Sequence, residues 1–243
     1  MSKHRGSLSV GLSQAAVDVL RYLKRRYDYR RLSSITSISA STLSRYVTGK
    51  TMPRAKNAKK ILERSLEIVN PREIVKEYFG NDLDVEGGVH ISHDVQTLKI
   101  LASYALNAFM GTRVNSSLAL DIPSIPLAAC FSSLIGGMLY FALDKPIWHD
   151  GEYLEVSYRS PGTTRTERLW FPSDSVKKGS SMIVFTSFIL SPSPIREVLR
   201  TLERHKIHVA GLFTLVTVKD TWDRLSVTPG CRRIALLIYE RSE

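Results

Sequence analysis

The chain has 243 residues, enough for two domains, and an apolar fraction of 43% that is normal for a globular protein. Its charge is uneven: residues 1–79 carry 17 Lys and Arg against 6 Asp and Glu, whereas residues 80–243 carry 17 of each. The whole excess of positive charge therefore lies in the first third, which favours a polyanionic partner for that part. Two cysteines, without a CxxC pair or a Cys/His cluster, exclude a disulfide scaffold and argue against a zinc site.

No segment indicates a membrane or a secretory pathway. The N-terminal residues MSKHRGSLSV lack the apolar core of a signal peptide. The longest apolar stretch, residues 122–143, is interrupted by Pro, Ser and Gly-Gly, which indicates a buried helix and not a membrane span. We therefore expect a cytoplasmic protein with no membrane partner, no metal ion and no cofactor.

Helical periodicity begins in residues 13–27, where Ser13 is a candidate N-cap. The polar, Gly-rich stretch 80–90 predicts a hinge between a head, residues 1–79, and a rear domain, residues 91–243. Within the head, further short helices are expected at residues 29–36, 41–49, 54–69 and 71–79.

The rear domain alternates between helical and strand patterns. Its last strands are continuous apolar runs, which are typical of a parallel sheet covered by helices on both faces. The predicted fold class is therefore α/β, with an all-α head and a mainly parallel sheet behind it. Helices are expected at residues 94–111, 126–143 and 195–207, and strands at 117–122, 146–149, 153–159, 181–187, 209–218 and 232–240.

Residues 32–47 (LSSITSISASTLSRYV) have the pattern of two short helices that cross at a steep angle. Their apolar side chains fall where such helices bury them, and small residues at 33 and 37 permit a tight turn. Ser41 is expected to cap the second helix. The exposed face of that helix offers hydroxyl groups and one guanidinium, which suit base edges and flanking phosphates. A solvated surface helix is the alternative interpretation.

With the following GKTMP, this segment resembles the helix-turn-helix of the Cro/repressor type, whose third helix enters the major groove of DNA. Ser33 and Ser37 stand where that family has Ala and Gly. An RNA-binding head is disfavoured, because the head offers no aromatic surface on which single-stranded RNA could stack. The resemblance implies DNA contacts from Ser41, Thr42, Ser44, Arg45, Thr48, Lys50, Arg54, Lys56 and Lys59.

Residues 181–196 (SMIVFTSFILSPSPIR) combine a buried strand, a Ser-rich loop and the start of an amphipathic helix, a place where phosphate binds readily. With Lys177-Lys178-Gly179 before the strand and DIPSIPLAA at 121–129, the layout resembles a type I phosphoribosyltransferase over about residues 85–240. In that family the strand runs into two acidic residues. A TTGGT-like loop then cradles the 5-phosphate of phosphoribosyl pyrophosphate.

The departures from that family matter for chemistry. The acidic pair falls on Thr186 and Ser187, and the Gly-rich loop falls on residues 191–194, where two prolines lack the backbone N–H that would hold phosphate. We therefore expect no catalytic residue and no phosphoribosyl transfer. Hydroxyl groups could still bind a phosphate or nucleotide, or they only cap the next helix. The candidate ligand-binding residues are Ser124, Thr186, Ser187, Ser191 and Ser193.

Bacterial and archaeal purine- and sugar-related regulators join a helix-turn-helix head to a phosphoribosyltransferase-like domain, as purine-repressor- and orotate phosphoribosyltransferase-like proteins do. The chain resembles an archaeal member of this class. The resemblance implies a homodimeric transcriptional regulator that binds double-stranded DNA. Its rear domain senses a nucleotide or phosphoribosyl pyrophosphate, or serves only for dimerisation. The alternative is an active phosphoribosyltransferase with an accessory nucleic-acid-binding head.

Overall fold

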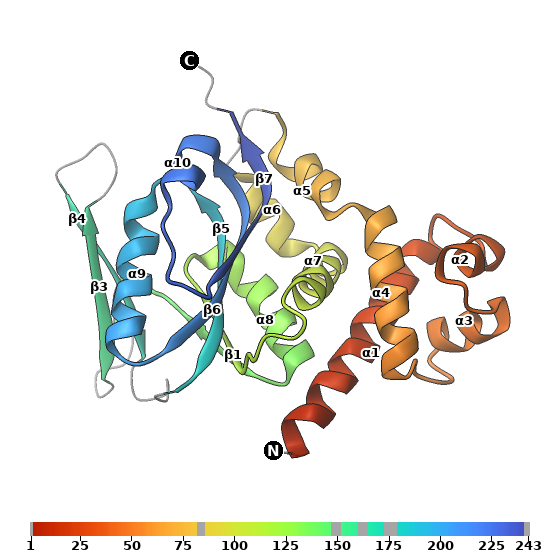
Figure 1. The fold of residues 1–243 in the computed structure, drawn as a ribbon. Coiled ribbons are helices and arrows are strands. Elements are labelled where there is room, and N and C mark those ends of the chain that lie inside the picture. Colours follow the sequence, from red (N-terminus) through yellow and green to blue (C-terminus); the bar gives the residue numbers. More distant parts are fainter. Residues whose placement is uncertain (1, 82–85, 147–151, 160–164, 173–178, 241–243) are drawn as a thin grey trace.

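The computed structural model describes residues 2–81, 86–146, 152–159, 165–172 and 179–240, and of residues 2–9 only the backbone. Within these ranges a helical region leads into a five-stranded sheet (Figure 1). The four short helices expected after residue 28 are confirmed to within two residues at either end. The helical region consists of α1 (Ser2–Lys24), α2 (Tyr29–Thr36), α3 (Ala40–Val47), α4 (Ala55–Val69), α5 (Pro71–Phe79), α6 (Glu86–His93) and α7 (Val95–Ala108).

The strands of the main sheet run parallel in the order β2-β1-β5-β6-β7, which confirms the predicted fold class. They are β1 (Ser116–Ala119), β2 (Met138–Phe141), β5 (Ser181–Ile189), β6 (His208–Val218) and β7 (Arg232–Tyr239). Helices α7 and α8 (Ile125–Ile135) cover one face, and α9 (Pro192–Arg204) and α10 (Lys219–Arg224) cover the other (Figure 1). A separate antiparallel hairpin of β3 (Tyr153–Arg159) and β4 (Thr166–Pro172) lies outside α9.

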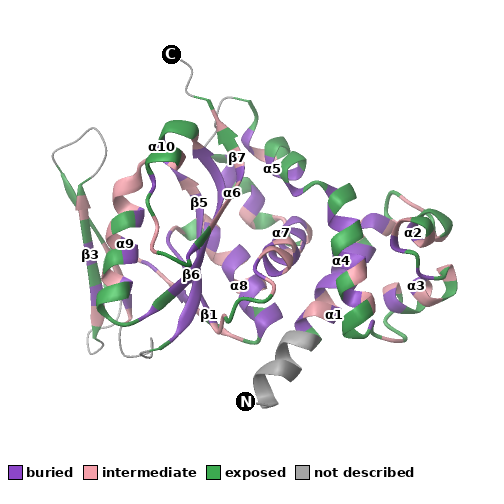
Figure 2. Cartoon of the chain, viewed as in Figure 1, coloured by how far each residue is buried: buried purple, intermediate pink, exposed green. Residues whose placement is uncertain are grey.

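The central strands β5 and β6 are buried along almost their whole length (Figure 2). Helices on both faces remove water from both rows of side chains, so apolar residues replace the alternation of a one-sided sheet. This explains why the apolar runs at 181–187 and 209–218 predicted these two strands correctly.

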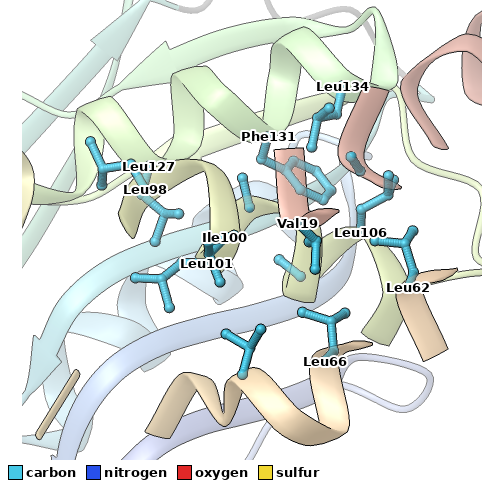
Figure 3. Packing of buried hydrophobic residues seen from close by; sticks show 14 of the residues in the cluster. Val19, Leu62, Leu66, Leu98, Ile100, Leu101, Leu106, Leu127, Phe131 and Leu134 are labelled. Carbon is cyan, nitrogen blue, oxygen red and sulfur yellow. The ribbon is translucent and has the colours of Figure 1, made fainter. Parts of the chain in front are cut away.

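Helix α1 is buried on every side over residues 15–20. A helix without a polar face needs neighbours all round. Helix α4 supplies them on one side, and α7 and α8 on the other. Figure 3 shows Val19 of α1 among side chains of these helices, including Leu62 and Phe131. One apolar core therefore extends from the helical region to the sheet.

Several expected helix boundaries differ from the structure, and two of them lie far from the observed residues. Helix α1 begins at Ser2 and not after Ser13, which is a buried residue inside the helix and donates its hydroxyl to the carbonyl oxygen of Pro53 at 2.7 Å. The helix expected at 126–143 ends at Ile135. Gly136 has a φ of 62°, which residues with a side chain rarely adopt, and the chain then enters β2.

Other expectations fall partly outside the described residues. Of the stretch 80–90 expected as a hinge, residues 82–85 are not described and residues 86–90 belong to α6. Residues 147–149 of the strand expected at 146–149 are also not described. No separate strand was expected at the position of β4, and no helix at the position of α10. Among the described residues, no helix is both long enough and apolar enough to cross a membrane.

The crossing of α1 and α8 depends on Gly11. A Cβ atom on this residue would lie 1.6 Å from the carbonyl oxygen of Leu134. We expect Gly11→Ala to lower the free energy of unfolding by about 1–3 kcal/mol, because the backbones must separate, even though Ala favours a helix by about 1 kcal/mol. Urea denaturation measures the change. Val10→Ala, at a position 68% exposed, is the control. Equal stability of the two variants would show that the crossing is not tight.

Candidate functional site

The carboxyl edge of the sheet has a topological switch point between β1 and β5. From β1 the chain builds β2 on one side, and from β5 it builds β6 and β7 on the other. In open α/β sheets, ligands bind in the crevice outside the carboxyl ends of the strands that diverge at such a point. Ser124 follows β1, and Thr186 and Ser187 lie near the end of β5, so these three candidate ligand-binding residues meet here, whereas Ser191 and Ser193 lie at the start of α9.

The carboxylate of Asp121 is central to this edge. Its Oδ1 accepts hydrogen bonds from the backbone N–H of Ser124 at 2.9 Å and from the hydroxyl of Ser187 at 2.8 Å. Its Oδ2 accepts from the hydroxyl of Thr186 at 2.6 Å and from the backbone N–H of Ser187 at 2.8 Å. Three of the candidate residues, Ser124, Thr186 and Ser187, therefore surround one carboxylate.

These four bonds use the carboxylate fully. An ionised carboxyl group has about four lone-pair sites on its two oxygens, and each of the four donors takes one. No lone pair of Asp121 remains for Mg²⁺ or for a ribose hydroxyl. Thr186 and Ser187 are buried, with 4% and 0% of their surface exposed, and their hydroxyls donate into the cluster. The arrangement joins the ends of β1 and β5 and leaves little to offer a ligand.

Helix α6 further restricts access to this cluster. At Gly88, a Cβ atom would lie 3.4 Å from the Cβ of Ser187 and 3.7 Å from the Cβ of Pro123. The helix backbone thus lies directly against the residues that follow β1 and end β5. Gly88 is buried in this contact. The neighbouring Gly87 is buried against α5, where a Cβ atom would lie 2.5 Å from the carbonyl oxygen of Tyr78.

Beside the cluster, a groove of about 250 Å³ lies between the end of β5 and the β3–β4 hairpin. Its described lining includes the carboxyl groups of Asp121 and Glu167 and no Lys or Arg. Tyr158 donates to Glu167 at 2.8 Å, and burial together with this bond raises the pKa of Tyr158 to about 12. The phenol is therefore neutral at physiological pH. A groove with two acidic groups repels a ligand that carries several phosphate charges.

The start of α9 lies where the resemblance to phosphoribosyltransferases placed a phosphate-binding loop. Ser191 is its N-cap and accepts a hydrogen bond from the backbone N–H of Ser193 at 3.4 Å. Pro192 and Pro194 have no N–H to donate. The hydroxyl of Ser191 thus caps the helix, as the alternative interpretation expected. Ser191 also lines the groove with Thr186, whereas Ser193 does not belong to its lining.

In the head, α2 and α3 are joined by a three-residue turn, residues 37–39. Ser37 lies in the left-handed region, with φ 50° and ψ 41°, a conformation that favours glycine. Two basic residues of α4 hold it: Lys60 donates to its carbonyl oxygen at 3.2 Å, and Arg64 donates to its hydroxyl. The N-cap of α3 is Ser39 and not Ser41, because the helix begins one residue earlier than expected.

Helix α3 has one buried and one exposed face. Leu43 and Tyr46 are buried. Ser41, Arg45 and Thr48 are exposed at spacings of four and three residues, so they share the outer face. Thr42 and Ser44 are half-buried beside them. The guanidinium of Arg21 on α1 donates to the carbonyl oxygen of Val47 at 3.1 Å and fixes the end of α3.

The remaining basic candidates surround the turn that leads into α4 and its first helical turns. Lys50, Arg54, Lys56 and Lys59 are all exposed. Lys59 pairs with Glu63 at 3.6 Å. Within the described residues, Arg45, Lys50, Arg54 and Lys56 form no ion pair. This part of the surface therefore carries uncompensated positive charge.

The sequence analysis did not select Asp121 or Gly88 as site residues. Asp121 directly follows a short apolar strand, and the carboxyl ends of neighbouring parallel strands meet at one edge, so a carboxylate near Thr186 could have been predicted. No local signal indicates the approach of Gly88, which depends on how α6 returns over the sheet. Among the described residues, no group of three or more His, Cys, Asp or Glu side chains is placed to hold a metal ion.

We expect Asp121→Asn to lower the free energy of unfolding by about 3 kcal/mol. The amide NH₂ would face donors where an oxygen now accepts, so at least one buried donor loses its partner. Asp144→Asn, at an exposed position, is the matched control. Urea denaturation of both variants measures the difference, and equal midpoints would contradict the structural role of this carboxylate.

No protein-family model matches the chain, and no curated protein sequence is similar to it. Among solved structures, adenine phosphoribosyltransferase from Rhodothermus marinus matches with a TM-score of 0.57 and 13% identity, covering 70% of this chain and 99% of that chain. The enzyme from Thermoanaerobacter pseudethanolicus matches with a TM-score of 0.53 and 16% identity, covering 65% and 87%. The Saccharomyces cerevisiae enzyme, in complex with an iminoaltritol bisphosphate and adenine, matches with a TM-score of 0.57 and 11% identity, covering 69% and 99%. The chain thus has a helical N-terminal region followed by a domain with the type I phosphoribosyltransferase-like fold.

Proposed function

We propose that the protein is a transcriptional regulator that binds double-stranded DNA in the cytoplasm through α2 and α3. The observation that carries this proposal is the exposed face of α3, where Ser41, Arg45 and Thr48 lie on a surface with unpaired positive charge. Hydroxyl and guanidinium groups on a short exposed helix suit the hydrogen-bonding edges of base pairs in the major groove.

The side chains that hold α3 and its preceding turn in place favour the same function. A helix that reads base edges has to be held in a fixed orientation. Arg21 holds the carboxyl end of α3, and Lys60 and Arg64 hold the turn before it. Lys50, Arg54 and Lys56 flank this unit and are free to contact phosphates, which position a protein on the duplex without reading sequence.

We further propose that the sheet domain does not transfer phosphoribosyl groups. The carboxylate of Asp121 has no free lone pair for a metal ion. Pro192 and Pro194 have no backbone N–H groups that could bind phosphate at the start of α9. The acidic groove disfavours phosphoribosyl pyrophosphate and nucleotides. The domain would therefore serve mainly to pair two copies of the chain.

A homodimer is part of the proposal. A two-fold pair presents two α3 helices and matches a DNA site made of two inverted halves, separated by whole helical turns.

DNA binding tests the role of α3. We expect Arg45→Ala to weaken binding to a preferred duplex, selected from a random library by the wild-type protein, by about 1–3 kcal/mol if the guanidinium reads a base. Lys56→Ala should weaken binding to preferred and random DNA alike and reduce the slope of log affinity against log salt by about 1. Fluorescence anisotropy at several salt concentrations measures both.

The control for these variants is Arg204→Ala, which removes the same charge from the exposed end of α9. It should leave both the affinity and the salt slope almost unchanged. If Arg45→Ala and Lys56→Ala also bind as the wild type does, α3 and the start of α4 do not form the DNA-binding surface.

An assay of pyrophosphate release tests the absence of catalysis. We expect no release from phosphoribosyl pyrophosphate with Mg²⁺ and adenine, guanine, hypoxanthine, uracil or orotate, because no carboxylate of the cluster is available to the metal. Release above the buffer rate that Asp121→Asn abolishes would establish the alternative, an active phosphoribosyltransferase.

A further inference from the structure

Strand β7 forms one edge of the main sheet. It pairs with β6 on one side, and no described strand pairs with its other side. The opposite edge strand, β2, has only four residues, and Leu143, just after it, bridges to Trp170 of the hairpin. Strand β7 has eight residues and no register shift. The long open edge of the sheet is therefore β7.

Beyond Arg232 and Arg233, the sequence of β7 lacks the charges, prolines and bulges by which proteins often protect an open edge. Such strands are usually short, bulged, or interrupted by Lys or Pro. Residues 234–239 (IALLIY) contain no charge, no Pro and no Gly. Ile238 is 48% exposed. Helix α5 lies beside this strand, and Tyr239 donates to the carbonyl oxygen of Gly80 at 2.6 Å, but no described strand takes up the open hydrogen-bonding edge of β7.

A groove of about 510 Å³ follows this edge between β7 and α5. Residues 235–240 form one wall, and Arg72, Glu73 and Lys76 of α5 are on the other. The groove runs along the open edge, so an additional strand could hydrogen-bond to β7 while its side chains lie beside α5.

We propose that the occupant of this edge is β7 of a second copy of the chain, running antiparallel about a two-fold axis at Leu236. This inference rests on the dimer in the proposed function and identifies its interface. It would join two five-stranded sheets into one continuous sheet and leave no long open edge at the junction.

The sequence RRIALLIYE at 232–240 is complementary to itself in this register. Arg232 is opposite Glu240, Ile234 is opposite Ile238, and Leu236 is opposite its own copy. Opposite charges and apolar pairs directly across from each other stabilise a sheet. Because of the two-fold symmetry, the Arg232–Glu240 pair and the Ile234–Ile238 pair each occur twice in the interface. Moving the axis by one residue either way would place Arg232 opposite Ile238 or Glu240 opposite Ile234, so only the register at Leu236 matches the charges.

Both charged residues are accessible to a partner. The side chain of Glu240 is 78% exposed, and its pair with Lys219 at 2.8 Å is a surface contact that stabilises little. Arg232 is exposed and donates to the carbonyl oxygen of Ala108, and its five N–H groups leave capacity for a carboxylate. Arg233, in contrast, is held on its own chain over the ring of Trp222 and by the carbonyl oxygen of Leu225.

A charge exchange in the full-length chain tests this interface. Sedimentation equilibrium measures the dimer dissociation constant of the wild type, Arg232→Glu, Glu240→Arg and the double variant. Each single change places like charges opposite each other at two symmetric positions, and we expect it to raise the dissociation constant roughly tenfold or more. The double variant restores opposite charges and should return to within about threefold of the wild type.

Lys219→Ala is the matched control, because it removes the partner of Glu240 within one chain and leaves the proposed cross-strand pair intact. It should not weaken the dimer. Ile238→Lys provides a second test that does not depend on charge exchange: a cation opposite Ile234 should also weaken the dimer, and circular dichroism checks that the variant is folded.

The outcomes separate this inference from the proposed function. Weakening by the single changes with recovery in the double variant supports the β7 interface. A dimer whose dissociation constant is the same in all variants, or single changes without recovery, overturns the interface and leaves DNA binding and dimerisation standing. A wild type that remains monomeric at every concentration overturns the interface together with the dimer, while the DNA-binding measurements still decide the role of α3.

Discussion

The structure depends on the burial of α1. Residues 15–20 are enclosed by α4 on one side and by α7 and α8 on the other, so the same helix belongs to the core of the head and to the core of the sheet domain. Gly11 allows the close crossing with α8, and Asp18, itself buried, accepts from Gln14 at 3.2 Å and faces Lys99 of α7 at 3.9 Å. Because Arg21 of this helix also holds the end of α3, the orientation of α3 is tied to the sheet domain through one continuous element. A change in the packing of α7 or α8 would therefore act directly on the candidate DNA-binding surface.

The sheet domain has a phosphoribosyltransferase-like fold, and a hydrogen-bonded carboxylate lies at its switch point. A carboxylate is present at the carboxyl edge, contributed by Asp121 after β1 and not by the end of β5. Thr186 and Ser187 near the end of β5 donate hydrogen bonds to Asp121. The carboxylate of Asp121, which could otherwise bind a ligand, thus links the ends of β1 and β5 by hydrogen bonds. Two other features also make this edge less suitable for a ligand. Helix α6 packs against it at Gly88 and takes up space, and the prolines at the start of α9 lack the N–H groups that could donate to a ligand.

Two exposed features remain once the cores are accounted for: the basic face around α3 and the open edge of β7. They lie in different parts of the molecule, with α3 at the end of the helical region and β7 at the edge of the sheet (Figure 1). Pairing at the sheet edge would therefore leave α3 uncovered on both copies. This separation is what a two-fold DNA-binding protein requires, because the surface that holds the dimer together must not compete with the surface that meets the duplex.

The sequence by itself determined most of the elements and the fold class. Helical periodicity located α2 to α5, and the continuous apolar runs located β5, β6 and β7 and indicated a parallel sheet, because these patterns follow from which faces of an element are buried. Local patterns could not decide where α1 begins, that Gly136 ends α8 before β2, or that Ser39 caps α3, since each depends on the backbone angles and neighbours of a few residues. The tertiary structure decided which groups bind the carboxylate of Asp121 and therefore what the candidate site can offer a ligand. Asp121 and Ser187 are 66 residues apart along the chain, and only the parallel pairing of β1 with β5 brings the carboxylate to its three donors on Thr186 and Ser187.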